Sequence, residues 1–120
     1  MLKIASLLLI IGQIQAIPNG FSLLSKVDPT IIQSVRYFTE QNFIGRVMYG
    51  YVCNQLIMTN EAAQALKGVQ SDLVSQGYSL VVYDSFRPQR TVDFFVDWAN
   101  NITDLKMKEF YYPYLNGSKL

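Results

Sequence analysis

The sequence contains no histidine and a single cysteine, Cys53, among its 120 residues. Without imidazoles and with one thiol, these residues cannot build a His/Cys zinc site, a Ser-His-Asp triad or an internal disulfide. Charge of one sign is also lacking, because ten Lys and Arg face nine Asp and Glu, for a net charge of +1. Electrostatic binding to nucleic acid or to acidic lipid is therefore not expected. Any catalysis must come from carboxylates, Arg, Tyr or Lys, or from residues outside this sequence.

Apolar residues, by contrast, are abundant. They make up 50% of the chain, and aromatic residues alone make up 13%. This composition excludes intrinsic disorder, which needs low hydrophobicity and high net charge. The length predicts one small domain, since domains typically run to about 100–150 residues.

The first 16 residues have the pattern of a secretory signal peptide. A positive start at Lys3 precedes an aliphatic run over residues 4–14, and Ala16 supplies a small residue before the expected cleavage point. An uncleaved membrane anchor is the alternative, but spanning a bilayer needs about 20 apolar residues. The sequence therefore predicts a secreted protein whose residues 17–120 form the domain, with no membrane span after cleavage. Two Asn-x-Ser/Thr sequons, at Asn101 and Asn116, agree with export, although such tripeptides also arise by chance.

The pattern of the mature chain predicts an α+β fold in which two helices flank a small central sheet. Short irregular or edge strands are expected over residues 35–57. A first helix should begin after Thr59, bury positions 62, 65, 66, 69 and 73, and end at Gly77. Residues 78–83 form a β-branched and aromatic run that predicts a central strand. A second helix should begin at Pro88, bury positions 92, 95, 96 and 99, and end at residues 100–101.

The junction between that strand and the second helix is where a functional side chain is expected. Arg87 precedes Pro88, which favours an extended backbone and directs the arginine away from the helix axis. A planar guanidinium in such a place can bind a carboxylate or oppose an oxyanion that develops in a reaction. The alternative is structural, because Arg87 could pair with Asp84 or Asp93 and merely attach the strand to the helix.

Three segments, in the same order and at compatible spacing, resemble the D-alanyl-D-alanine dipeptidases, the zinc enzymes of the vancomycin-resistance type. They correspond to the family's Arg-Tyr-Ala-Thr-x-x-Asn-Phe-x-Gly stretch with its later Gly-Tyr, its Asp-Gly-Tyr-Arg-Pro segment, and its Tyr-Tyr-Pro. Here they read as residues 35–45 with 49–51, residues 83–93 with 98–99, and residues 111–113.

This resemblance implies a zinc metallopeptidase that hydrolyses D-alanyl-D-alanine, a small dipeptide substrate, with Arg87 as the catalytic residue that stabilises the tetrahedral intermediate. Ser85 and Phe86 depart from the family's glycine and tyrosine but leave the arginine in place. The family's His-x-x-Gly-x-x-x-Asp zinc segment and its Glu-x-x-His are not present. The chain thus resembles the amino-terminal half of the domain, a partial or truncated domain that holds no zinc ligands and is expected to be inactive alone.

Two interpretations remain open. In the first, the chain is part of the dipeptidase. In the second, it is a non-catalytic pseudo-enzyme or a module that binds peptidoglycan peptides through Arg87. Cys53 is interpreted as a small buried hydrophobe or a free thiol. Asp93 and Asp97, four residues apart on the second helix, are interpreted as a solvated face rather than a metal pair.

Overall fold

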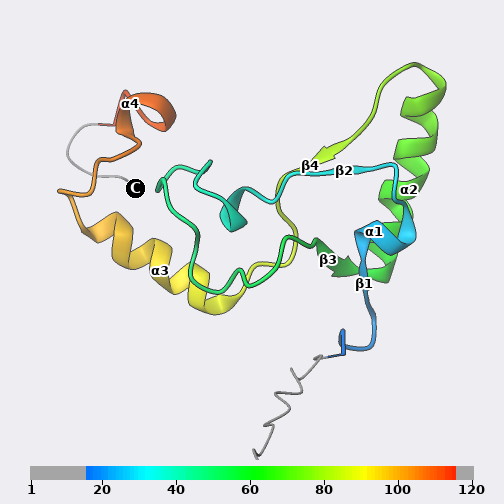
Figure 1. The fold of residues 1–120 in the computed structure, drawn as a ribbon, viewed down its shortest axis with the longest axis horizontal. Helices are drawn as coiled ribbons and strands as arrows, with labels where there is room; N and C mark the ends of the chain where they lie inside the picture. Colours follow the sequence, from blue (N-terminus) through cyan, green and yellow to red (C-terminus); the bar gives the residue numbers. More distant parts are fainter. Residues whose placement is uncertain (1–15, 116–120) are drawn as a thin grey trace, which may run out of the picture.

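The computed structural model describes residues 16–115, and the signal-peptide prediction for residues 1–16 falls almost wholly outside them. The element order is β1 (Phe21–Leu23), α1 (Leu24–Val27), β2 (Ile32–Gln33), a 3-10 turn (Arg36–Phe38), β3 (Ile57–Thr59), α2 (Asn60–Ser75), β4 (Val81–Val82), α3 (Gln89–Asn100) and α4 (Lys108–Tyr111). This is an α+β arrangement, as predicted. In Figure 1, α1 and α2 lie at one end, α3 and α4 lie at the other, and the β2–β4 pair joins them. No helix among these residues is long and apolar enough to cross a membrane.

Two short sheets connect segments that are distant in sequence. β1 pairs with β3 in antiparallel fashion, with Ser22 opposite Met58. β2 pairs with β4 in parallel, with Ile32 opposite Val81. The hydrogen bonds of this second pair continue past the strands, because the Arg36 amide donates to the Tyr83 carbonyl at 3.1 Å. The extended ladder therefore brings the 3-10 turn beside the segment that follows β4.

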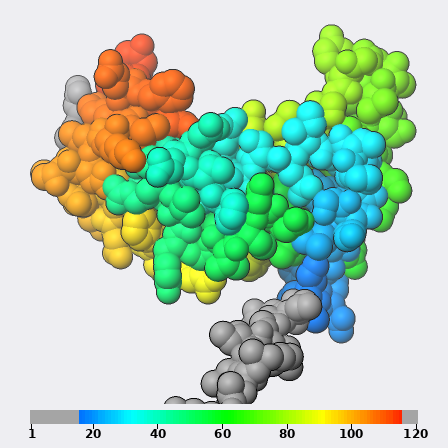
Figure 2. All heavy atoms as spheres, in the orientation of Figure 1, coloured from blue at the N-terminus to red at the C-terminus, as the bar shows by residue number. Residues whose placement is uncertain are grey.

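Each end of the molecule has its own hydrophobic core. The first core is centred on residues from α1, β3 and α2, including Leu24, Met58 and Ala63. The second core is centred on Ile44, Met48 and Trp98 and is surrounded mainly by aromatic side chains. Tyr51 packs against both cores. The chain between the 3-10 turn and β3 fills the middle of the molecule, in teal and green in Figure 2, and is irregular rather than strand-like before β3.

The ends of α2 agree with the sequence prediction. The Thr59 hydroxyl accepts a hydrogen bond from the Ala62 amide, and Glu61 lies in the first turn, where the helix dipole favours a negative charge. Beyond the helix, Gly77 adopts a φ of 82°, a left-handed conformation that glycine reaches without strain.

The buried face of α2 differs from the prediction. Ala63 and Gln70 are buried and Leu66 and Leu73 are partly buried, whereas the predicted positions 62, 65 and 69 are exposed. The reason is Gln70, whose amide serves as a polar connector. Its Nε2 donates to the Thr30 carbonyl at 3.1 Å, and its Oε1 accepts from the Leu80 amide at 2.8 Å. A buried glutamine that satisfies the main chain on both sides fixes which face points inward.

The predicted central strand over residues 78–83 is wrong in extent and position. β4 comprises only Val81–Val82, and β2 is its single partner among the residues that the structure describes. Tyr78 still belongs to the end of α2, because its amide donates to the Leu73 carbonyl at 2.9 Å. Hydrophobic composition predicted a strand buried on both faces, but Val81 remains exposed.

The second helix begins and ends near the predicted residues, with Pro88 as its N-cap and Asn101 as its C-cap. Its buried face is again shifted, since Thr91 and Trp98 are buried while the predicted Val92 and Val96 are exposed. Two interactions account for this. The Thr91 hydroxyl donates to the Tyr49 carbonyl at 2.7 Å, and the larger aromatic side chains of the helix bury more apolar area than the valines would.

We expect Gln70→Leu to lower the free energy of unfolding by about 1–3 kcal/mol, because it leaves the Leu80 amide and the Thr30 carbonyl without their partner in a region that water does not fully reach. Urea titrations of the protein measure the change. Gln64→Leu, at an exposed position of the same helix, is the matched control. Equal stability of the two variants would contradict the connecting role of Gln70.

Candidate functional site

The segment after β4 carries an ion pair that a tyrosine completes. Asp84 Oδ2 accepts hydrogen bonds from Arg87 Nε at 3.0 Å and from Arg87 Nη2 at 2.7 Å. The hydroxyl of Tyr51, 33 residues earlier in the chain, donates to the other oxygen, Asp84 Oδ1, at 2.6 Å. Both carboxylate oxygens are thus engaged. The Asp84 side chain is held from two sides, and it in turn fixes the Arg87 guanidinium through two donors.

The guanidinium lies against two aromatic rings. Its central carbon is 5.0 Å from the centroid of the Tyr37 ring and 5.4 Å from that of Phe95. The two rings contact each other with centroids 5.2 Å apart. Tyr37 comes from the 3-10 turn, and Phe95 comes from α3. Cation–π attraction and the ion pair therefore act together to hold Arg87 in one orientation.

The local environment shifts the pKa values of these groups in consistent directions. Burial raises the pKa of the Tyr51 hydroxyl well above its usual range, and its hydrogen bond to the Asp84 carboxylate raises it further. Burial also raises the pKa of Tyr37. For Arg87, burial is the largest single influence and opposes the charged form, but the hydrogen bonds to Asp84 and the electrostatic interactions with Tyr37 and Asp84 together outweigh it and raise the guanidinium pKa. The raised pKa values keep both tyrosine hydroxyls neutral near neutral pH, beside the ion pair of Arg87 and Asp84.

Arg87 is held on one edge and accessible on another. Its side chain is 40% exposed, whereas that of Asp84 is only 17% exposed. Nε and Nη2 form the ion pair, and Nη1 takes no part in it. The sequence left open whether Arg87 is a structural link to Asp84 or a group that meets a ligand. The link to Asp84 is present, and the Arg87 side chain is nevertheless 40% exposed.

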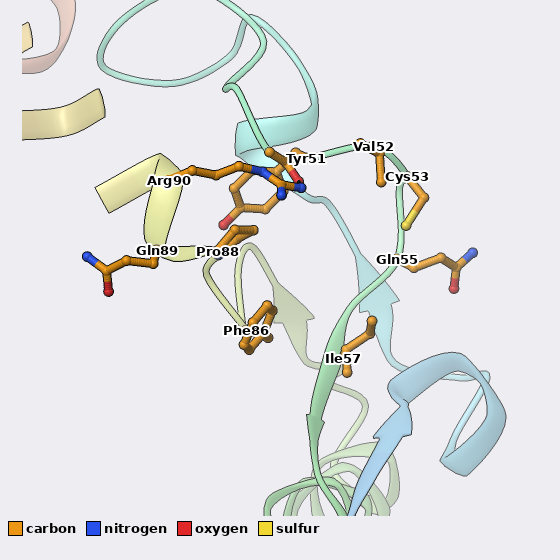
Figure 3. Close-up of a pocket in the computed structure, with 10 residues that line it drawn as sticks. Tyr51, Val52, Cys53, Gln55, Ile57, Phe86, Pro88, Gln89 and Arg90 are labelled. Carbon is orange, nitrogen blue, oxygen red and sulfur yellow. The ribbon is translucent and has the colours of Figure 1, made fainter. Parts of the chain in front are cut away.

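Two hollows of about 490 Å³ each flank this group. The first hollow, drawn in Figure 3, lies between the loop before β3 and the start of α3, with Tyr51, Cys53, Phe86 and Pro88 on its walls. The second hollow is lined by Arg36, Tyr37, Tyr83, Asp84, Phe110 and Tyr111, among others. Each hollow shares one residue with the hydrogen-bonded group, Tyr51 in the first and Asp84 in the second. A ligand in either would therefore lie near the ion pair.

The loop on one wall of the first hollow depends on a glycine. Gly50 adopts a φ of 109°, and a Cβ there would come within 2.8 Å of Arg90 Nε and of Thr91 Oγ1. Its carbonyl accepts a hydrogen bond from Arg90 Nη2 at 3.2 Å. The first turn of α3 can approach this loop closely only because position 50 has no side chain.

Metal-ligating side chains do not converge in the part of the chain that the structure describes, where no three Cys, Asp or Glu residues lie close enough to share an ion. Asp84 is engaged by Tyr51 and Arg87. Asp93 and Asp97 are exposed, in agreement with the solvated face predicted for them. The residues present therefore do not fit a zinc site. Cys53 is a free thiol and is exposed, so the interpretation as a buried hydrophobe was wrong.

Comparison with protein families gives a match over residues 18–116 to the D-ala-D-ala dipeptidase family of peptidases. The chain belongs to this family. Among curated members, a D-alanyl-D-alanine dipeptidase of Enterococcus faecalis is 35% identical over 102 residues, which are 85% of this chain and 50% of the relative. One of Enterococcus faecium is 33% identical over 105 residues, 84% of this chain and 50% of the relative. One of Streptomyces coelicolor is 29% identical over 102 residues, again 50% of the relative.

The chain therefore spans about half the length of the curated dipeptidases it matches. The family assignment made from the sequence motifs is confirmed. The motifs also contained Tyr37 and Tyr51, but sequence reasoning assigned them no role. Tyr51 and Asp84 form a hydrogen bond although they are 33 residues apart in the sequence, and a local sequence pattern cannot predict such a contact. The one available signal was that the Gly-Tyr of residues 50–51 belongs to the family's motif.

We expect Tyr51→Phe to lower the free energy of unfolding by about 1–2 kcal/mol near neutral pH, because the Asp84 carboxylate loses the hydrogen bond that the Tyr51 hydroxyl donates to it. The pKa of Tyr51 is raised in the folded state, so its contribution is complete below the unfolded value of about 10 and is lost as the pH rises above it. Urea titrations between pH 8 and 11 should show a shallower decline for Tyr51→Phe than for the parent. Tyr78→Phe, at an exposed tyrosine, controls for the loss of a hydroxyl.

Proposed function

We propose that this chain provides part of a dipeptidase that hydrolyses D-alanyl-D-alanine, and that Arg87 stabilises the negative charge that develops on the carbonyl oxygen of the scissile bond. The observation that carries the proposal is the orientation of Arg87. Asp84 binds two of its donors, the rings of Tyr37 and Phe95 lie against it, and 40% of the side chain stays exposed. A structural link alone does not require the exposed edge.

The chemistry needs a donor whose position is fixed before the reaction begins. Attack on a peptide carbonyl moves charge onto its oxygen, and a preoriented donor stabilises that charge without the cost of reorganising solvent. A guanidinium suits this role because it is always charged, planar and rich in donors. Asp84 and Tyr51 would act as positioning residues, since Asp84 binds two nitrogens of Arg87 and Tyr51 binds the Asp84 carboxylate.

The proposal includes zinc, because the resemblance to this peptidase family implies it. The described residues do not supply its ligands, so no step is assigned to the metal here. We place the ligands in a segment that corresponds to the second half of the relatives, whether in the same polypeptide or in a separate one. The present chain would then supply the arginine and the aromatic wall of a composite site.

Export is also part of the proposal. The aliphatic run and the small residue at position 16 are typical of a cleaved leader, and the family match begins just beyond them, at residue 18. D-Alanyl-D-alanine occurs at the ends of bacterial cell-wall peptides, so a secreted dipeptidase would meet its substrate outside the cell.

Nucleic acid is not an expected partner, because the positive and negative charges of the chain nearly balance.

A second candidate function, the binding of peptides without hydrolysis, draws support from the second hollow. Arg36 lines it with its guanidinium 4.4 Å from the centroid of the Tyr83 ring, and it donates to Gln41 Oε1 rather than to a carboxylate. A cation on an aromatic wall is suited to a peptide carboxylate. This function would need no metal and no second half.

The experiment that separates the two joins residues 17–120 to the carboxy-terminal half of the Enterococcus faecium relative and assays D-alanyl-D-alanine hydrolysis with zinc. We expect turnover by the fusion, and none by residues 17–120 or by the added half on its own. A fusion that folds and binds zinc but does not hydrolyse the dipeptide would contradict the dipeptidase proposal. Calorimetric binding of the dipeptide to that inactive fusion would favour the binding function.

A further inference from the structure

The turn that follows α3 contains one of the two sequons, Asn101-Ile102-Thr103. Neither the ion pair nor the hollows of the candidate site use these residues. We propose that Asn101 is a glycosylation site that carries an N-linked oligosaccharide in the mature protein. The proposal rests on the export of the chain, which is part of the proposed function, but not on its peptidase activity.

The sequon is placed where a large modification fits. Asn101 is the C-cap of α3, at the point where the chain leaves the helix, and its side chain is exposed. Ile102 is 63% exposed and Thr103 is also exposed, so all three residues of the sequon face solvent. An oligosaccharide of many sugar units on Asn101 would therefore extend into solvent without displacing a packed side chain.

The acceptor and the hydroxyl of the sequon already lie together. Asn101 Oδ1 accepts hydrogen bonds from the Thr103 hydroxyl at 2.8 Å and from the Thr103 amide at 3.2 Å. This turn shows that the local sequence brings the carboxamide and the hydroxyl of the tripeptide together at the exposed surface. A purely structural turn would show the same bonds, so exposure and export are needed as well.

The modification would leave the candidate site open. None of residues 101–103 lines either hollow of the candidate site, and Arg87 precedes α3 while Asn101 follows it. Around the turn, Ile102 and Leu105 expose apolar side chains that a glycan would cover. Shielding of apolar surface by sugar raises solubility in a secreted protein.

The donor is an oligosaccharide carried on a polyisoprenyl diphosphate, supplied with its transferase by the secretory membrane. The Asn101 amide nitrogen, Nδ2, forms a bond to the first carbon of the oligosaccharide, and the bond from that carbon to the diphosphate oxygen breaks. The nitrogen loses one proton, and the lipid diphosphate leaves with the electrons of the broken bond. No oxidant or reductant takes part. The transfer acts on the chain as it enters the secretory compartment.

The test is to express residues 1–120 in eukaryotic cells and to map the secreted protein by mass spectrometry after digestion with peptide N-glycosidase, which converts a glycosylated asparagine to aspartate. We expect this conversion at Asn101. Asn101→Gln and Thr103→Ala should abolish it, while Thr103→Ser, which keeps the hydroxyl, should retain it. Asn100→Gln is the matched control, because Asn100 is the exposed neighbour outside the sequon.

Secreted protein in which Asn101 is unmodified would overturn the proposal and leave Asn101 as a structural cap alone. If residues 1–120 are not secreted, the export proposal fails on its own account. In that case, residues 17–120 are expressed behind an established secretory leader, and conversion of Asn101 to aspartate by peptide N-glycosidase again tests whether Asn101 is glycosylated. Asn116→Gln in either form shows whether conversion at Asn101 is independent of the second sequon, which lies outside the described residues.

Discussion

Replacement of Arg87 by alanine is expected to lower kcat of the completed dipeptidase, the fusion of residues 17–120 with a relative's second half, by about 100-fold or more. That is the usual loss when one donor to an oxyanion is removed. The free energy of unfolding should change little by comparison, because the Arg87 side chain is 40% exposed and ion pairs of exposed side chains add about 1 kcal/mol or less. KM for D-alanyl-D-alanine should change only slightly if the interaction forms in the transition state.

Two further variants sharpen this result. Arg87→Lys keeps the charge but loses the planar fork that meets Asp84 through two nitrogens, so it should restore only part of the rate. Arg46→Ala is the matched control, because Arg46 also forms an ion pair, with Asp104, and its side chain is 44% exposed, but it lines neither hollow of the candidate site. If Arg87→Ala and Asp84→Ala both unfold the protein, Arg87 is a structural link and the catalytic assignment is wrong.

Replacement of Trp98 by alanine is expected to have the largest effect on stability, a loss of about 3–5 kcal/mol in the free energy of unfolding. Trp98 is 7% exposed and contacts the rings of Phe43 and Tyr112, with centroids 5.1 and 5.7 Å away. Truncation would therefore leave a cavity in the middle of the second core, between α3 and the segment around α4. Urea titrations of the completed dipeptidase measure the loss.

Val96→Ala on the same helix is the control for that experiment. Val96 is 52% exposed, so its truncation should change stability by no more than about 0.5 kcal/mol. The sequence pattern had placed Val96 on the buried face of α3, which the exposure of its side chain contradicts. A larger loss for Val96→Ala than for Trp98→Ala would mean that the helix is rotated relative to the structure described here.

The ends of the two long helices could be predicted from the sequence, but their buried faces could not. The starts and ends of α2 and α3 follow from local chemistry, such as the cap at Thr59, the glycine at position 77 and the proline at position 88, and all were predicted. The buried faces of both helices depend on partners elsewhere in the chain. Gln70 is buried because residues 30 and 80 need its amide, which no helical periodicity reveals.

For the candidate site, likewise, one residue was predicted from the sequence and its partners were not. Arg87 was singled out from its place between a strand and a proline, and the family motif supported it. Its orientation by Asp84, Tyr51 and two rings could not be predicted from the sequence, because those groups come from four separate segments of the chain. The short strands β1 and β2 and the helices α1 and α4 were missed, since two to four residues are too few to show a hydrophobic period.

The most direct test of the central claim is the affinity of the completed dipeptidase for a phosphinate analogue of D-alanyl-D-alanine, whose tetrahedral, negatively charged group imitates the transition state. If Arg87 stabilises that charge, Arg87→Ala should weaken inhibition by the phosphinate by about the same factor, 100-fold or more, by which it lowers kcat/KM. Inhibition by the product D-alanine should stay within a few-fold of the parent. Equal inhibition of the parent and Arg87→Ala by the phosphinate would contradict the claim, because the arginine would then make no contact that is specific to the transition state.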